Sequence, residues 1–98
     1  MDIYLPQVLE KDYFLELLSK IEAIRSFNVD MIRNQDLVTI VVNKFGETRL
    51  SFKETKQDKD VKYTLVHEDM ATFHKPFRSA IIEGLSEALG RVGGRVVL

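Results

Sequence analysis

Two histidines and two carboxylates late in the chain have the clearest potential for chemistry. His67, Glu68, Asp69 and His74 carry groups that can bind a metal ion or move a proton. Their spacing matches no ligand motif, and Pro76 interrupts the segment that would have to position them. Acids at this place are typical of a helix N-terminus, where the dipole favours negative charge. We therefore expect histidines near water, with no metal site and no cofactor.

Motifs for nucleophilic catalysis and phosphate binding are not found in the sequence either. None of the serines is flanked by the glycines of a nucleophile elbow. The glycine-rich segment 90–94 follows a helical pattern, whereas phosphate-binding loops precede a helix. The sequence therefore predicts a protein that is not an enzyme, and a small enzyme is the least favoured class of function.

A basic stripe is the first candidate for binding. Between residues 44 and 62 the chain has six lysines and arginines against four acids, a local net charge of +2. Strand parity places Arg49, Lys53 and Lys62 on the open face of a sheet, where they could bind nucleic-acid phosphates or an acidic partner. The alternative is a solvated face with cross-strand ion pairs, which the interleaved acids favour.

The run Leu37–Val42 is the second candidate, because it is apolar on both faces of a strand. In a simple meander this strand lies at an edge, so Leu37, Thr39 and Val41 would face water beside an unpaired edge. Val66, on the third strand, is expected on the same outer side. A partner protein or a second copy of the chain could cover this surface. The connector 26–36 or the C-terminal tail could cover it instead.

The elements that must position these residues define an α+β fold. Apolar residues at helical spacing predict a helix from about Pro6 to Arg25, and strands follow near 37–43, 48–55 and 61–67. A second helix is expected from about Thr72–Lys75 to Leu89. The predicted fold is a helix, a three-stranded antiparallel meander and a helix, with both helices on one face of the sheet. We expect residues 1–92 to form a single domain and 93–98 a short tail or an extra edge strand.

The predicted element order is that of double-stranded RNA-binding domains and of the small Alu-domain proteins of the signal recognition particle. The RNA-binding family has a lysine-rich start to its second helix. The corresponding segment here, residues 73–78, contains only Lys75 and Arg78 as basic residues. The resemblance is therefore one of element order alone, and we assign the chain to no family.

Length, charge and cysteine content limit the number of domains and the cellular compartment that we expect. The chain has 98 residues, a net charge of -1 and no cysteine, which indicates one small domain and is compatible with a reducing cytoplasm. No apolar run approaches the roughly 20 residues of a membrane helix, and no membrane partner is expected. Our leading hypothesis is a cytoplasmic, non-catalytic protein-interaction or regulatory module that forms a homodimer through the edge of the first strand. Nucleic-acid binding is the alternative.

Overall fold

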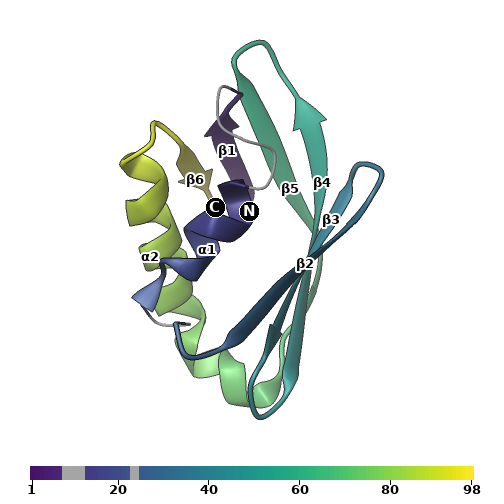
Figure 1. Ribbon diagram of the computed structural model, residues 1–98, viewed down its shortest axis with the longest axis vertical. Helices are drawn as coiled ribbons and strands as arrows, with labels where there is room; N and C mark the ends of the chain where they lie inside the picture. Colours follow the sequence, from purple (N-terminus) through teal and green to yellow (C-terminus); the bar gives the residue numbers. More distant parts are fainter. Residues whose placement is uncertain (8–12, 23–24) are drawn as a thin grey trace.

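The chain forms a six-stranded antiparallel sheet with helices packed against it. The computed structural model describes residues 1–7, 13–22 and 25–98 (Figure 1). The strand order is β2-β3-β4-β5-β1-β6, with antiparallel pairing between all neighbours. In chain order the elements are β1 (Asp2–Pro6), α1 (Tyr13–Ser19), β2 (Asn28–Asn34), β3 (Leu37–Asn43), β4 (Glu47–Lys56), β5 (Asp60–Asp69), the 3-10 helix η2 (Thr72–Phe77), α2 (Arg78–Gly90) and β6 (Arg95–Val97).

The expected fold, a helix, a three-stranded meander and a helix with both helices on one face, is wrong. Strands β3, β4 and β5 lie where the meander was predicted, but β1, β2 and β6 extend the sheet on both sides. The element order shared with double-stranded RNA-binding domains is therefore not present in this structure. A strand precedes the first helix, and a further strand follows it.

The first helix is described over a shorter range than the sequence pattern predicts. Pro6 does not begin a helix, because it is the last residue of β1 and lies opposite Asp60 of β5. Proline is tolerated at the end of a strand, where a missing N–H donor does little harm. The described helix α1 covers Tyr13–Ser19. The parts of the predicted helix at residues 8–12 and 23–24 lie outside the described residues.

The connector expected at 26–36 contributes a strand that covers the edge of β3. Residues 28–34 pair with β3 along its whole length through a hairpin whose loop residue Gln35 has a φ of 57°. β3 therefore has β2 on one side and β4 on the other. The expectation of a free edge along residues 37–43 is wrong, because the chain itself supplies the neighbouring strand.

The hydrophobic core lies between the helices and one face of the sheet, here called the inner face. Phe14 of α1 packs edge-to-face against Phe52 of β4 and Tyr63 of β5, with ring centroids 5.5 and 4.8 Å apart. The buried core side chains come from both helices, from four strands and from Ile21, which follows α1. They include Ile3, Phe14, Leu17, Val38, Ile40, Phe52 and Leu89.

The second helical segment begins as a 3-10 helix that contains Pro76 and continues as α2 from Arg78. After α2 the chain returns to the sheet as β6, in which Val97 lies opposite Asp2 of β1, so the two termini are neighbours (Figure 1). No helix in the described part of the chain has the length and apolar character that crossing a bilayer requires.

Candidate functional site

The four residues predicted to form an interface share the face of the sheet opposite the helices, here called the outer face. Leu37, Thr39 and Val41 of β3 alternate with the buried Val38, Ile40 and Val42 and therefore point outward. Val66 lies at a β-bulge in β5, where the register shifts and leaves it without a paired residue on β4. Val66 is 55% exposed, whereas Val41 is buried despite its outward direction.

A fifth apolar residue, Ile32 of β2, joins this outer surface. It lies opposite Thr39 in the register and is 50% exposed. The other apolar residues of this segment, Phe27, Val29 and Met31, pack against the core instead. The missed signal is a seven-residue alternation, in which Val29, Met31 and Arg33 are half-buried and their neighbours are exposed. We call the surface of Ile32, Leu37, Thr39, Val41 and Val66 the outer patch.

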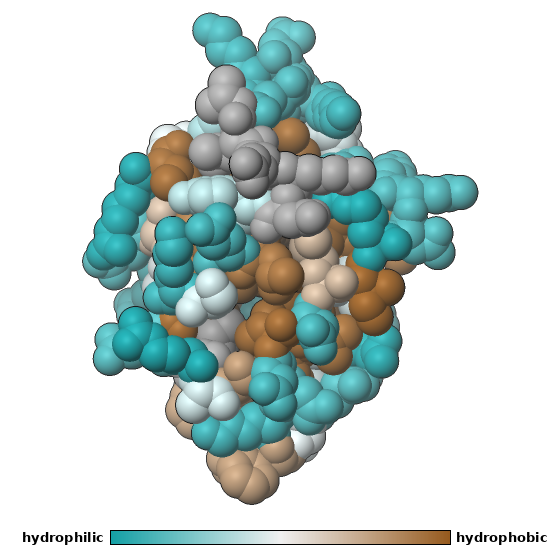
Figure 2. Space-filling model, in the orientation of Figure 1, coloured by the Kyte–Doolittle hydropathy of each residue, from teal (hydrophilic) through white to brown (hydrophobic). Residues whose placement is uncertain are grey.

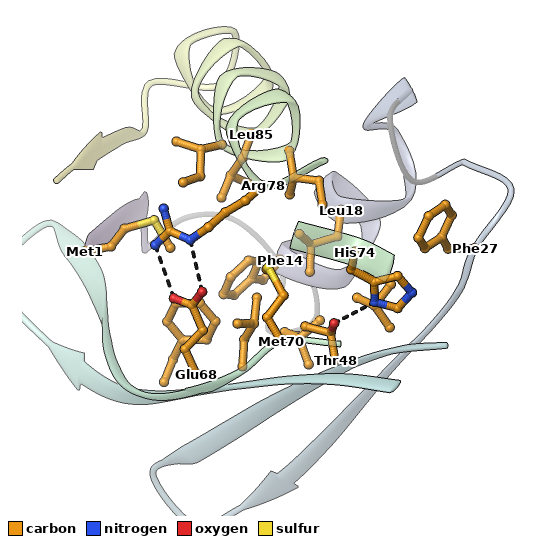
Figure 3. A pocket seen from close by; sticks show the side chains of 16 residues that line it. Met1, Phe14, Leu18, Phe27, Thr48, Glu68, Met70, His74, Arg78 and Leu85 are labelled. Carbon is orange, nitrogen blue, oxygen red and sulfur yellow. Dashed lines mark hydrogen bonds and ion pairs between the residues drawn. The ribbon is translucent and has the colours of Figure 1, made fainter. Parts of the chain in front are cut away.

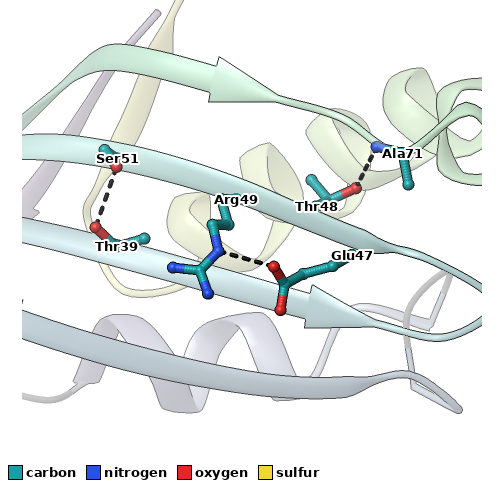
Figure 4. A network of polar contacts seen from close by, with 6 residues as sticks. All are labelled: Thr39, Glu47, Thr48, Arg49, Ser51 and Ala71. Atoms are coloured by element: carbon teal, nitrogen blue, oxygen red, sulfur yellow. Dashed lines mark hydrogen bonds and ion pairs between the residues drawn. The ribbon is translucent and has the colours of Figure 1, made fainter.

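Polar contacts hold the middle of the outer face in place. The hydroxyl groups of Thr39 and Ser51 are 3.0 Å apart and link β3 to β4 beside the outer patch (Figure 4). Nearby, the Nε of Arg49 donates to Glu47 Oε2 at 2.8 Å, and this hydrogen bond raises the pKa of Arg49 (Figure 4). These contacts fix the side chains around the patch, so the surface is largely pre-formed.

The residues proposed for nucleic-acid binding also lie on the outer face, but their charges are partly neutralised. Arg49 is paired with Glu47, and Lys62 lies 3.8 Å from Asp2. Lys53 lies between Leu37 and Thr64 in the register and is exposed. The structure thus brings Arg49, Lys53 and Lys62 to one face, as parity predicts, but not into a continuous strip of free positive charge.

The charges beside the outer patch are arranged asymmetrically. The row containing Val41 and Arg49 ends in Asp30 on β2 and Asp69 on β5. On the other side of the patch, Lys53 lies in the row of Leu37. Since Arg49 is engaged by Glu47, an acidic border and a basic border flank the apolar residues.

A second candidate is an apolar cavity of about 50 Å³ between the inner face and the helices (Figure 3). Its lining is almost entirely hydrophobic and includes Phe14, Ile40, Met70 and Leu85. Ligand pockets typically occupy about 300–1,000 Å³, so this space is too small for a molecule of that size. It has room for roughly four water-sized groups, yet it offers them few polar partners.

One ion pair lies at this cavity. Arg78 of α2 donates from Nε and Nη2 to the two carboxylate oxygens of Glu68 at 3.0 and 3.1 Å (Figure 3). These hydrogen bonds lower the pKa of Glu68, although partial burial opposes the shift. Glu68 is therefore held as a carboxylate with both oxygens occupied, which does not suit a general acid or base.

His74 is buried and fully hydrogen-bonded, which contradicts the expectation of a histidine near water. Its Nε2 lies 2.7 Å from the carbonyl oxygen of Lys44, so this nitrogen must donate a proton. Its Nδ1 lies 2.6 Å from the Thr48 hydroxyl, which in turn accepts the N–H of Ala71 at 3.0 Å. The neutral imidazole with its proton on Nε2 satisfies all these contacts. His74 is thus a structural link between η2 and the β3–β4 hairpin, whereas His67 is exposed on β5.

Comparison with known proteins gives no assignment. No family model, no curated protein and no solved structure matches this chain. The function must therefore be inferred from the surfaces and side chains described above.

Proposed function

We propose that this protein is a non-catalytic interaction module that forms a homodimer through the outer patch. The observation that carries the proposal is the set of apolar residues on the face of the sheet that neither described helix covers. Ile32 and Val66 are at least half exposed there, and Leu37 is 37% exposed in the row next to Ile32. Antiparallel sheets usually keep one face polar when it meets water, so an apolar outer patch favours burial against a partner.

The arrangement of charges around the outer patch favours a second copy of the chain as the partner. A two-fold axis along the row Ile32–Thr39–Ser51 would place the basic border of one copy against the acidic border of the other. Leu37 of each copy would then face Val41 of its mate. Lys53 would face Arg49, whose charge Glu47 engages, with Asp69 on the next strand. Packing two sheets face to face in this way is a common arrangement of β structure.

The interface must extend beyond the apolar side chains. A stable protein interface buries about 800 Å² on each partner, which is more than five side chains provide. The charged borders would therefore be included in the contact. Since Ile32 and Val66 are already about half buried, complete burial of either should stabilise the dimer by about half of the roughly 1.5–3 kcal/mol that a fully exposed side chain would give.

Sedimentation velocity over a range of protein concentrations tests the proposal. The wild-type chain should shift from monomer to dimer, and Ile32→Lys or Val66→Lys should remain monomeric while keeping its thermal stability. Val97→Lys is the matched control, because Val97 is 46% exposed on the same sheet but lies on β6, away from the outer patch. A wild-type chain that stays monomeric at high concentration would refute self-association.

The same variants separate this proposal from nucleic-acid binding. If the outer face instead binds duplex RNA or DNA, binding should weaken steeply with salt and with Lys53→Gln. Ile32→Lys would then strengthen that binding, since it adds a positive charge. Such a result would replace the dimer proposal with the alternative.

A further inference from the structure

An exposed pair of phenylalanines forms one end of the molecule. Phe45, in the β3–β4 hairpin, is 78% exposed, and Phe73, in η2, is 49% exposed. Their rings pack edge-to-face with centroids 5.3 Å apart. Hydrophobic side chains project at the lower end of Figure 2, where the hairpin and η2 lie in Figure 1. We call Phe45, Phe73 and the neighbouring Lys44 and Lys75 the aromatic tip.

Phe45 has an unfavourable backbone conformation, so an exposed phenylalanine at this position costs conformational energy. Its φ is 54°, in the left-handed region that bulky residues rarely adopt and that asparagine and glycine prefer. Gly46 follows with a φ of 140°, and a Cβ placed there would lie 3.0 Å from the Cβ of Ala71. The turn therefore needs its glycine, but nothing in its geometry calls for phenylalanine at 45. Unfavourable backbone of this kind is concentrated at functional sites.

Buried contacts hold the aromatic tip rigidly. The carbonyl of Lys44 accepts the Nε2 proton of His74, and Phe73 packs against the rings of both His74 and Phe77. Phe27 also packs on His74, with centroids 5.1 Å apart. The two exposed rings thus come from different elements that one buried histidine joins.

The positive charge of Lys44 lies behind the outermost ring. Its Nζ donates to Ser26 Oγ at 2.9 Å and lies 5.2 Å from the Phe27 ring and 5.9 Å from the Phe45 ring. Lys75 of η2 is a second cation and is exposed, whereas Lys44 is half-buried. The nearest acid along the hairpin, Glu47, is occupied by Arg49. The tip therefore combines two exposed rings with two cations, one of which lies 5.9 Å from the Phe45 ring.

We propose that the aromatic tip inserts into the surface of an anionic lipid bilayer. Phenylalanine rings have no hydrogen-bonding group, so hydrocarbon suits them, and the ammonium groups behind them would lie at the level of the lipid phosphates. The N–H and C=O of Lys44 are already paired with Gly46 and His74, which reduces the cost of leaving water. Aromatic anchors of protein interfaces are more often tryptophan and tyrosine, which carry a polar handle.

This contact differs from a membrane-spanning segment. The expectation of no membrane partner rests on net charge and on the length of apolar runs. Neither of these sequence properties detects two phenylalanine rings that only folding brings together. The aromatic tip is also separate from the outer patch, so either surface can act without the other.

Vesicle sedimentation tests the proposal. With vesicles of equimolar phosphatidylcholine and phosphatidylserine, the wild-type chain should co-sediment, and with phosphatidylcholine alone the bound fraction should fall at least tenfold. Phe45→Asn should lose binding at least tenfold while its melting temperature stays the same or rises, because asparagine accepts the left-handed backbone. Leu98→Asn is the matched control, since Leu98 is 84% exposed but lies at the C-terminus; it should bind as the wild type does.

A fluorescent reporter gives an independent measurement. The chain has no tryptophan, so Phe45→Trp introduces a single indole at the tip. Its emission should shift to shorter wavelength with anionic vesicles, and Lys44→Gln combined with Lys75→Gln should abolish the shift. The absence of both co-sedimentation and an emission shift would overturn the proposal, as would equal binding by Phe45→Asn. Capture of the tip by a protein, with no vesicle binding, would likewise overturn it in favour of a protein groove.

Discussion

The Nδ1 of His74 lies 2.6 Å from the hydroxyl oxygen of Thr48, and this buried contact joins η2 to the start of β4. Thr48 also accepts the backbone N–H of Ala71, so its hydroxyl group makes hydrogen bonds both to His74 and to the residue that precedes η2. The arrangement fixes the β3–β4 hairpin against η2 and thereby fixes the aromatic tip. Both residues are almost completely buried, so each loses access to water as an alternative partner.

We predict that His74→Ala destabilises the fold by about 3 kcal/mol. The substitution leaves a cavity, removes the His74 donor from the Lys44 carbonyl and removes the acceptor of the Thr48 hydroxyl proton. Urea denaturation followed by circular dichroism measures the change. His67→Ala is the control, because His67 is exposed on β5, and its free energy of unfolding should stay within about 0.5 kcal/mol of wild type. Equal effects of the two substitutions would show that His74 is not a structural link.

Helix α2 packs closely at Gly84 against Ile21, which follows the end of α1, and a side chain at Gly84 should be damaging. A Cβ at this position would lie 2.7 Å from Cγ2 of the buried Ile21. We expect Gly84→Ala to cost about 1–3 kcal/mol through overpacking. Gly90→Ala, in the same helix, meets no atom within 4 Å and should stabilise by up to about 1 kcal/mol through helix propensity. Thermal unfolding of both variants checks the opposite signs.

Alkaline pH should destabilise the protein through Tyr63. Burial, assisted by a hydrogen bond with Glu54, raises the pKa of Tyr63 to about 12. The unfolded chain therefore loses this proton near pH 10, while the folded chain keeps it. The contribution of Tyr63 to the free energy of unfolding is fully present below pH 10. It falls between about pH 10 and 12, by at most about 1.4 kcal/mol per pH unit. Unfolding of Tyr63→Phe over the same range should show a shallower decline; parallel curves for the two proteins would contradict the assignment.

Swapping the charges at positions 53 and 69 together should partly restore the dimerisation that either single substitution weakens. Lys53→Glu and Asp69→Lys should each weaken dimerisation, because each removes an attraction between the basic and acidic borders and adds a repulsion. The combined variant should recover part of the loss, with a coupling energy of about 0.5–1 kcal/mol. Sedimentation equilibrium in low salt measures the four dissociation constants of this cycle, including that of the wild type. Simple additivity of the two losses would place Lys53 away from Asp69 of the other copy.

The sequence predicts the central strands well because their signals are local. The run Leu37–Val42 is a strand, and the alternation in Thr48–Thr55 matches the inner and outer faces of β4. Strand β2 was missed because its residues carry conflicting signals, whereas β6 lies in the segment 93–98, for which an extra edge strand was one of the two expectations. Asn28, Asp30 and Asn34 are typical of turns, yet here they occupy the exposed positions of a strand whose other residues face the core. Their conformation is decided by pairing with β3, which no local pattern contains.

The candidate surfaces likewise combine features that local sequence patterns predict with features that only the folded structure produces. Parity alone places Leu37, Thr39, Val41 and Val66 on the outer face, but the bulge that leaves Val66 without a paired residue depends on the register of two strands. Phe45 and Phe73 are 28 positions apart in the sequence, and only tertiary packing brings their rings into contact. The burial of His74 likewise depends on tertiary packing. These features therefore could not be found from spacing along the chain.

Site-specific cross-linking tests the central claim most directly, because it locates the dimer interface. The chain has no cysteine, so Thr39→Cys introduces one thiol at the centre of the outer patch, beside the proposed two-fold axis. A short bis-maleimide should link Thr39→Cys into a covalent dimer. Thr55→Cys, on the outer face of β4 but away from the patch, should remain a monomer. Efficient linking at Thr55 with none at Thr39, or none at either position, would contradict a dimer formed through the outer patch.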